Sequence, residues 1–275
     1  MRLREAATGS LIYLSVSGTR AAFRVVHHGK PDGSYDDSFS GGVILMLDCS
    51  EEPVRTKMVE EVDQRKGDYS GSYMHEMLNS VWLARLDSAL AEQVVQVKLP
   101  YRKGTASDPC VVASGSEGLS ARVWLPSIAE VALGEASLTS TARCYVEEGA
   151  VFDYFQDATS SLYSSWKVTD PVAGGDDGWG TRTPGQYTSG VYADYFCKID
   201  YMGNWYNGGK NQVYVRPCLV LPETTLLDGT RQVMVGAETP VKIDGAWRVG
   251  VSWAKTDGVW HKTEHIYGKV EGSWK

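Results

Sequence analysis

The sequence predicts a mixed fold that is built from many short β-strands and a few short helices. Gly, Trp and Tyr are abundant, with 29, 9 and 15 copies in 275 residues, and this composition is typical of turns and aromatic packing rather than of long helices. Short apolar runs recur at the spacing of strands, and one stretch keeps the spacing of a helix. We therefore expect one main domain followed by a smaller unit.

The N-terminal part of the chain predicts a hairpin followed by a buried strand. Residues 10–17 and 20–28 flank a Ser-Gly-Thr turn, and their apolar patterning predicts two antiparallel strands. Residues 41–48 predict a short buried strand. The charged residues 51–69 predict irregular or weakly helical structure.

A helical segment follows, and we expect Ser72 to cap its N-terminus. The apolar residues at helical spacing are Met74, Met77, Leu78, Val81, Trp82, Leu86, Ala89 and Leu90. A break before Asp87 predicts that a second helix starts there. Residues 94–101 then predict a strand that ends at a proline turn.

The middle of the chain predicts a strand, a short helix and long loops. Residues 122–133 predict a strand and then a short helix, which Ser127 caps together with Glu130. Residues 134–178 contain few apolar runs and predict long loops, which are usually functional in a compact domain. Residues 218–222 predict a closing strand.

The C-terminal part of the chain contains a repeat. Residues 242–247, 255–260 and 269–274 have the sequences KIDGAW, KTDGVW and KVEGSW, each with an acidic-Gly pair followed by Trp. Because Asp-Gly is a strong hairpin signal, the three copies predict a small β-meander with its Trp residues stacked on one face. We place the domain boundary near residue 223, between a main domain (1–222) and a β-rich attachment or oligomerisation tail (223–275).

Residues 179–217 have the composition of a binding surface. Nine of these 39 residues are aromatic, and most of the others are small and polar. Rigid aromatic side chains mixed with adaptable polar ones are typical of recognition surfaces. The alternative for any one aromatic residue is burial in the core, and Trp179, Phe196 and Trp205 are the candidates for it. The expected ligand contacts are Tyr187, Tyr192, Tyr195, Asp200, Tyr201, Asn204, Trp205, Tyr206 and Asn207.

Two arginines, Arg182 and Arg216, lie near the ends of this segment. A guanidinium can fix neighbouring chain segments by donating to backbone carbonyls or to a carboxylate, and we favour this structural role over ligand binding. The expected structural motif comprises Trp179, Arg182, Pro184, Arg216 and Pro217.

Six motifs in a fixed order suggest a family. They are FRVVHHGKPDGSYDDSFSGGVILMLD, YSGSYMHEMLN, VVQVKLPY, VWLPSIAEV, WGTRTP and VRPCLVL. Over residues 8–222 the chain resembles a widespread family of gut Firmicutes and their phages, which is similar to C-type-lectin-like domains of the formylglycine-generating-enzyme type. That family has a WWLRSP motif, which Trp179, Arg182 and Pro184 match, whereas Gly180 and Thr181 depart from it.

The resemblance implies an α+β, C-type-lectin-like fold with a small twisted sheet, two helices and long loops that face a ligand. Relatives of this fold include hypervariable receptor-binding proteins of phages that retroelements diversify, and the Trp repeats resemble the tails of phage virion proteins. It therefore implies a virion protein, made in the bacterial cytoplasm, that binds a bacterial cell-surface glycan or protein and contacts other virion proteins, with a homo-oligomer as one possible state. A location in the cytoplasm or on the bacterial surface is the alternative.

Two other functions are open from the sequence. One is a structural role in virion decoration or assembly, in which the aromatic residues contact neighbouring subunits. The other is an oxidoreductase of the formylglycine-generating type, for which Cys197 and Cys218 are the candidate pair. Cys218 lies in an apolar run, which favours a buried inert thiol. We therefore do not expect this protein to be an enzyme.

The sequence disfavours several classes of partner. A net charge of −7 with no basic block disfavours nucleic acid, and no apolar run is long enough to insert into a membrane. The pair His27-His28 and the isolated His75 have no third ligand at metal-site spacing, and Asp176, Asp177, Asp194 and Asp200 lack a calcium-site spacing. We therefore expect no metal and no cofactor.

Overall fold

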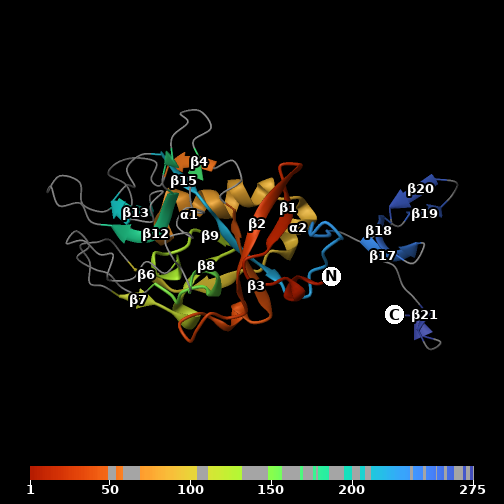
Figure 1. Ribbon diagram of the computed structural model, residues 1–275, viewed down its shortest axis with the longest axis horizontal. Coiled ribbons are helices and arrows are strands. Elements are labelled where there is room, and N and C mark those ends of the chain that lie inside the picture. Colours follow the sequence, from red (N-terminus) through yellow and green to blue (C-terminus); the bar gives the residue numbers. More distant parts are fainter. Residues whose placement is uncertain are drawn as a thin grey trace.

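A computed structural model gives the fold, which Figure 1 shows as a ribbon. Its described residues, with backbone and side chains, are 1–48, 69–103, 111–131, 148–156, 179–183 and 214–235. The backbone alone is described at the strand positions 54–57, 168–169, 176–177, 184–185, 195–199, 205–207, 212–213, 238–243, 246–251, 253–256, 259–262, 269–270 and 273–274.

The main sheet contains the predicted N-terminal hairpin and the predicted closing strand. Its order is β1 (Leu11–Val16), β2 (Thr19–His28), β3 (Gly42–Leu47), β16 (Cys218–Pro222) and β9 (Val123–Trp124). All neighbouring strands are antiparallel. Ser17 and Gly18 connect the paired residues Val16 and Thr19 and both have positive φ, as a two-residue hairpin turn requires.

A second sheet contains most of the aromatic segment. Its order is β14 (Trp205–Asn207), β13 (Tyr195–Ile199), β12 (Trp179–Gly185), β15 (Gln212–Val215) and β4 (Val54–Lys57). β12 and β15 are parallel, and the other pairs are antiparallel. The chain passes from β15 into β16 through Arg216 and Pro217 alone, so these two residues join the two sheets.

The prediction for residues 51–69 is wrong at β4, which is a strand rather than irregular or helical structure. All four of its residues pair with β15. A local pattern of charged residues does not reveal this, because an edge strand is stabilised by a partner that is distant in sequence. Residues 58–68 lie outside the described residues.

A continuous helical run covers residues 73–85, and a second helix follows it. The run is α1 (Tyr73–Met77), the π-helical turn η4 (Leu78–Trp82) and the 3₁₀ turn η5 (Leu83–Arg85), and the second helix is α2 (Ser88–Gln93). The Ser72 hydroxyl accepts a hydrogen bond from the His75 N–H at 3.1 Å, which confirms the predicted cap. The second helix begins directly after Asp87, also as predicted.

The structure corrects one predicted core residue, Val81, whose exposed fraction is 64%. A π-helical turn holds more residues than an α-helical turn, so the pattern of buried positions shifts within η4. Leu78 and Trp82 remain buried on either side of Val81.

Short ribbons and 3₁₀ turns complete the main body. The ribbons pair β5 (Val97–Leu99) with β8 (Leu119–Ala121), β6 (Tyr101–Arg102) with β7 (Val112–Ala113), and β10 (Val168–Thr169) with β11 (Asp176–Asp177). The 3₁₀ turns besides η5 are η1 (Leu3–Glu5), η2 (Asp37–Phe39), η3 (Tyr69–Gly71), η6 (Gly115–Glu117), η7 (Ala129–Val131) and η9 (Asp153–Phe155). The predicted strand at 94–101 is thus divided into β5 and β6, and the predicted short helix after Ser127 is the turn η7.

Large aromatic side chains fill the space between the main sheet and the elements around it. Phe23 of β2 contacts Trp82 of η4 with ring centroids 6.3 Å apart, and Phe39 contacts Trp124 of β9 at 5.8 Å. Both contacts are edge-to-face, the geometry that aromatic pairs prefer. The helical run therefore packs on the main sheet, as Figure 1 also shows.

The main body continues past the predicted boundary near residue 223. Leu227 and Val233 are buried, and the Val233 N–H donates to the Tyr13 carbonyl of β1 at 2.9 Å. The Tyr13 N–H in turn donates to the Arg231 carbonyl at 3.0 Å. Residues 223–235 therefore cover the edge of the main sheet.

Three hairpins follow in the tail. They are β17 (Glu238–Ile243) with β18 (Ala246–Val251), β19 (Trp253–Thr256) with β20 (Val259–Lys262), and β21 (Lys269–Val270) with β22 (Ser273–Trp274). In each hairpin the repeated Lys lies directly opposite the repeated Trp, in the pairs Lys242–Trp247, Lys255–Trp260 and Lys269–Trp274.

The described strands of the tail do not form the predicted continuous meander, because each hairpin is a separate two-stranded sheet. A single residue separates β18 from β19, and the shortest common hairpin connection needs two.

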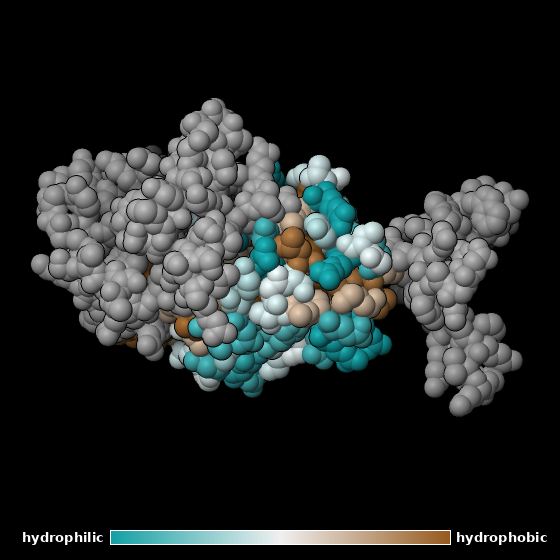
Figure 2. Space-filling model, in the orientation of Figure 1, coloured by the Kyte–Doolittle hydropathy of each residue, from teal (hydrophilic) through white to brown (hydrophobic). Residues whose placement is uncertain are grey.

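The fold is mixed, with several sheets and few helices, in agreement with the α+β class. Within the described parts of the chain, every helix is too short or too polar to cross a membrane. On the face in Figure 2, the described surface is mainly hydrophilic and its hydrophobic areas are small.

Candidate functional site

The aromatic segment lies on the second sheet. Trp179 of β12 pairs with Ile199 of β13 on one side and with Tyr214 of β15 on the other. Ile199 pairs in turn with Trp205 of β14. These four residues therefore form one row across the sheet.

Trp179 and Tyr214 are anchors in the core, with exposed fractions of 0% and 3%. The Arg216 guanidinium lies 5.3 Å from the centre of the Trp179 ring, and its Nε donates to the Leu47 carbonyl of β3 at 3.0 Å. Leu47 itself donates its N–H to the Pro217 carbonyl at 3.0 Å. The Arg-Pro pair therefore fixes the second sheet to the main sheet.

Arg182 is fully buried and forms a two-pronged ion pair with Glu130 of η7. Its Nη1 lies 2.6 Å from Oε2 of Glu130 and its Nη2 lies 2.8 Å from Oε1. The same two nitrogens donate to three backbone carbonyls, those of Leu125, Pro100 and Glu148. Burial by itself lowers the pKa of Arg182, but the charge of Glu130 raises it above the ordinary value. Arg182 is therefore charged, and these partners are all groups of the protein core.

The sequence did not identify Glu130 as the partner of Arg182. Its Oε2 accepts the Ser127 N–H at 2.9 Å, and its own N–H donates to the Ser127 hydroxyl at 3.1 Å. This reciprocal cap was predicted from the spacing of the two residues. The pairing with Arg182 was not, because 52 positions separate the two residues.

Two further buried side chains, those of Tyr35 and Glu148, lie near the ion pair. The Tyr35 hydroxyl donates to Oε1 of Glu130 at 2.5 Å, and burial raises the pKa of Tyr35 well above its ordinary value. Glu148 accepts the Arg102 N–H at 2.9 Å, and burial raises the pKa of its carboxyl. The pKa values of these buried groups are shifted, but their partners are protein groups in a closed core, which is typical of a structural network.

The ion pair connects chain segments that come from distant parts of the sequence. Besides the contacts of Arg182, the Ile128 N–H donates to the Thr183 hydroxyl at 3.0 Å and the Arg182 N–H donates to the Pro126 carbonyl at 3.1 Å. The centre of β12 is thus held by side-chain and backbone bonds at consecutive positions. This arrangement makes β12 a rigid support for the connections that follow it.

The predicted ligand contacts divide between strands and connections. Tyr195 begins β13, and Trp205, Tyr206 and Asn207 form β14, while Pro184 of the structural motif lies in β12. The other contacts lie outside the described residues, and they are Tyr187, Tyr192, Asp200, Tyr201 and Asn204.

The strand order separates these five residues into two groups. Tyr187 and Tyr192 belong to the first connection, residues 186–194, which runs from the end of β12 to the start of β13. The other three belong to the second connection, residues 200–204, between β13 and β14. Because β12 and β13 are antiparallel, the two connections are anchored at opposite ends of the sheet. The sheet therefore does not bring all predicted contacts to one end.

The two candidate cysteines lie in different sheets. Cys197 of β13 is opposite Asn207, whereas Cys218 of β16 lies between Met46 and Trp124. Cys218 is a free thiol that is fully buried, and burial raises its pKa well above the ordinary value. A thiol with a raised pKa is a poor nucleophile, as predicted for Cys218.

Two of the histidines that were considered as metal ligands, His27 and His75, make other contacts. Nδ1 of His27 accepts the Asp153 N–H at 3.3 Å and lies 3.2 Å from its carboxylate. His75 packs edge-on against Tyr69, with ring centroids 5.4 Å apart. Among the described residues, no three His, Cys, Asp or Glu side chains cluster as metal ligands do.

A comparison with protein families gives one match. A family model described as a domain of unknown function, DUF6273, matches residues 41–223, which is more than half of the chain and includes the whole aromatic segment. No curated protein matches the chain, and no solved structure does.

Proposed function

The chain belongs to the DUF6273 family, and we propose that it is a recognition protein that binds a bacterial cell-surface ligand. The ligand is a glycan or a protein, and it contacts the connections and the outer strand of the second sheet. The proposed role is binding rather than catalysis.

The main support for this proposal is the contrast between buried anchors and aromatic, polar connections within residues 179–217. The anchors Trp179, Arg182 and Arg216 are buried and tie β12 and β15 into the core. The residues between these strands are rich in Tyr, Gly and Asn. A rigid frame with aromatic and small polar connections is how many scaffolds present a binding site.

The two connections are anchored at opposite ends of the sheet, so they are separate candidates for the main ligand contact. We expect one connection to contribute most of the binding energy, because interfaces usually depend on a few central residues. The first connection offers Tyr187 and Tyr192, and the second offers Asp200, Tyr201 and Asn204. Tyrosine supplies a flat contact area for a sugar ring or a protein surface, and Asp and Asn supply hydrogen bonds.

The resemblance to C-type-lectin-like domains extends the proposal to fold family and setting. In this view the main body is a C-type-lectin-like domain of a phage virion, positioned at the tail tip, and the hairpins of the tail attach it to other virion proteins. The repeated Lys–Trp pairs support such an attachment role, since one repeated unit suits a repeated partner surface. A purely structural virion protein is the alternative, and the experiment below separates the two.

The test is binding of the full-length protein to intact cells and cell-wall fractions of several gut Firmicutes strains. Two variants run beside the wild type: Tyr187→Ala with Tyr192→Ala, and Asp200→Ala with Tyr201→Ala and Asn204→Ala. A Val81→Ala variant, altered at an exposed side chain of η4, is the control. We expect strain-selective binding that falls about tenfold or more in one of the two connection variants and is unchanged in the control.

Two outcomes would count against the proposal. If the wild type binds no strain while it assembles with virion components, the structural alternative is favoured. If both connection variants bind as the wild type does and melt at the same temperature, ligand binding does not depend on the two connections.

A further inference from the structure

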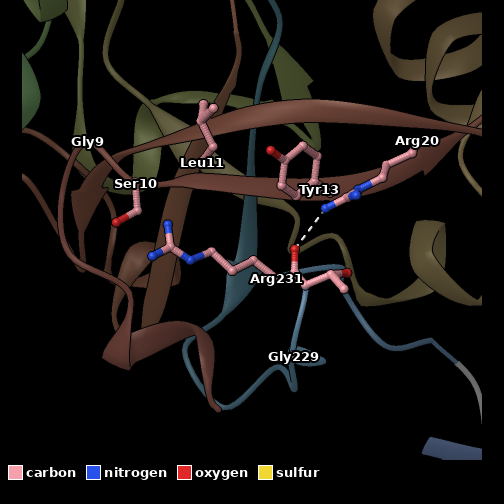
Figure 3. A pocket seen from close by; sticks show the side chains of 8 residues that line it. Gly9, Ser10, Leu11, Tyr13, Arg20, Gly229 and Arg231 are labelled. Carbon is pink, nitrogen blue, oxygen red and sulfur yellow. Dashed lines mark hydrogen bonds between the residues drawn. The ribbon is translucent and has the colours of Figure 1, made fainter.

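A pocket of about 470 Å³ lies where residues 229–231 meet the N-terminal hairpin (Figure 3), and no described residue of the second sheet lines it. Its polar lining consists of Ser10, Tyr13, Arg20, Thr230 and Arg231. We call it the arginine pocket. Two guanidinium groups and no carboxylate are among its lining residues, in a chain whose net charge is −7.

Arg20 is held in place before any ligand binds. One of its Nη atoms donates to the Thr230 carbonyl at 2.8 Å, and its guanidinium carbon lies 3.5 Å from the centre of the Tyr13 ring. An arginine has five N–H donors in a fixed plane, so this single hydrogen bond leaves donors for a ligand. Stacking on the ring reduces the entropy that the side chain loses on binding.

Arg231 has a backbone conformation that is unfavourable for its residue type. Its φ is +63°, in the left-handed region that favours Gly and Asn. The turn is held by Asp228, whose Oδ1 accepts the N–H groups of Thr230 and Gln232 at 2.7 and 2.9 Å. An arginine at a position where Gly or Asn would fit with less strain is typical of a residue with a functional role.

The Arg231 side chain is directed along the pocket. In Figure 3 it extends toward Ser10, while Arg20 lies on the other side beside Tyr13. No hydrogen bond or ion pair joins its guanidinium to another described residue, so its charge is uncompensated by them. The Asp228 carboxylate lines a separate hollow with Leu90 and Val235 and accepts hydrogen bonds from its own turn. Its charge also interacts with that of Arg20, so Arg231 is the guanidinium that depends on a ligand for a counter-charge.

We propose that the arginine pocket binds a small hydroxylated anion, whose phosphate or carboxylate group is held by Arg20 and Arg231. Arginine suits both groups, because its planar donors match two oxygens of an oxyanion at once. The volume exceeds that of one phosphate and is in the range of small-molecule sites, which leaves room for a glycerol- or sugar-sized body. The hydroxyls of Ser10 and Thr230 are available to accept hydrogen bonds from it.

This proposal is independent of the function proposed for the second sheet, because none of its lining residues belongs to residues 179–217. The two proposals can therefore fail separately. A variant of the arginine pocket is expected to keep cell binding through the connections, and the connection variants are expected to keep anion binding.

The test is isothermal titration calorimetry of the full-length protein with glycerol 3-phosphate and with glucuronate, with neutral glycerol as the control ligand. The variants are Arg231→Asn, which suits a positive φ without the charge, and Arg20→Gln. Arg4→Gln, altered at an exposed arginine outside the pocket, is the matched control. We expect binding of at least one anion, a loss of about tenfold or more in each pocket variant, and no change in the control.

The relative affinities of the two anions assign phosphate or carboxylate as the preferred group. Binding should also weaken as salt is raised from 50 to 500 mM, as expected for a charged contact. The absence of binding to both anions at 10 mM would overturn the proposal, and so would equal binding by wild type and Arg231→Asn. A melting curve guards against unfolding, since Arg231→Asn is expected to melt at or above the wild-type temperature.

Discussion

The Arg182 guanidinium receives its acceptors from separate segments of the chain: the Glu130 carboxylate and the carbonyls of Leu125, Pro100 and Glu148. Removing one partner of a buried ion pair leaves the other charge without compensation. We expect Arg182→Ala to lower the free energy of unfolding by about 3–5 kcal/mol, measured by urea denaturation. Arg85→Ala, at an exposed position, should change it by less than about 0.5 kcal/mol. A loss below about 1 kcal/mol for Arg182→Ala would contradict this role.

Gly149 is required by the same network. Its φ is +108°, and a Cβ placed there would lie 2.2 Å from the Tyr35 hydroxyl and 3.2 Å from Oε1 of Glu130. Gly149→Ala should therefore destabilise the protein by about 1–3 kcal/mol through overpacking, with a further cost from the backbone conformation. The matched control is Gly33→Ala, where a Cβ meets nothing within 4 Å. Equal melting temperatures for the two variants would show that the network adapts.

His27 makes the stability depend on pH. Burial lowers the pKa of its imidazole below the ordinary value of 6.5, and the Asp153 carboxylate opposes this only in part. The unfolded chain therefore binds the proton more readily than the folded protein does. The contribution of His27 is fully present above pH 6.5 and is lost as the pH falls from there through the folded pKa.

The measurement is urea denaturation at several pH values between 5 and 7.5. In the variant His27→Asn the side-chain oxygen can take the place of Nδ1 as the acceptor for the Asp153 N–H, and it does not titrate. We expect the wild type to lose more stability than this variant does over that interval. Parallel pH profiles would exclude His27 as the cause.

At the scale of elements, Trp205 and Tyr206 are neighbours in β14, and both were expected to contact the ligand. Positions opposite in register share a face of a sheet, and neighbouring positions in a strand lie on opposite faces. Trp205 belongs to the row of Trp179 and Tyr214, which are both buried, whereas Tyr206 occupies the alternate position. The register therefore groups position 205 with the buried positions, and Tyr206 is the better candidate for ligand contact.

We expect Trp205→Ala to cost about 2 kcal/mol or more in unfolding free energy, because its position lies in the row of the buried Trp179 and Tyr214. Tyr206→Ala should cost less than about 0.5 kcal/mol and should weaken cell binding. Denaturation and cell-binding measurements on both variants check this. A reversed order, with Tyr206→Ala the more destabilising change, would show that the row is not the packed side of β14.

At the scale of the whole molecule, residues 223–235 belong to the main body. They bury Leu227 and Val233 and pair with Tyr13 of β1. A chain that ends at Val235 should thus keep the stability of the main body, whereas one that ends at Pro222 should lose about 3 kcal/mol or more with the burial of two apolar side chains. Urea denaturation of the two truncated chains measures the difference, and equal midpoints would place the boundary at residue 223 after all.

Prediction from the sequence succeeded where the signal is short in range. The Ser17-Gly18 turn, the Ser72 cap and the reciprocal Ser127–Glu130 cap each depend on residues within four positions, and the structure contains all three. For the candidate site, the sequence indicated Trp179 as a candidate for burial and favoured a structural role for the two arginines. It gave no partner for Arg182 and no separation of the ligand contacts into two groups, because both depend on which strands pair.

By itself, the sequence determined the turns, the caps and the hairpins of this protein, since hydrogen bonds between near neighbours fix them. Only the tertiary structure decided that Val54–Lys57 is an edge strand, that Arg182 meets Glu130, and that Val81 faces outward. The same is true of the arginine pocket, which joins residues more than 200 positions apart. The physical reason is common to all of these: such contacts are stabilised by burial and by pairing between distant segments, which local patterns do not encode.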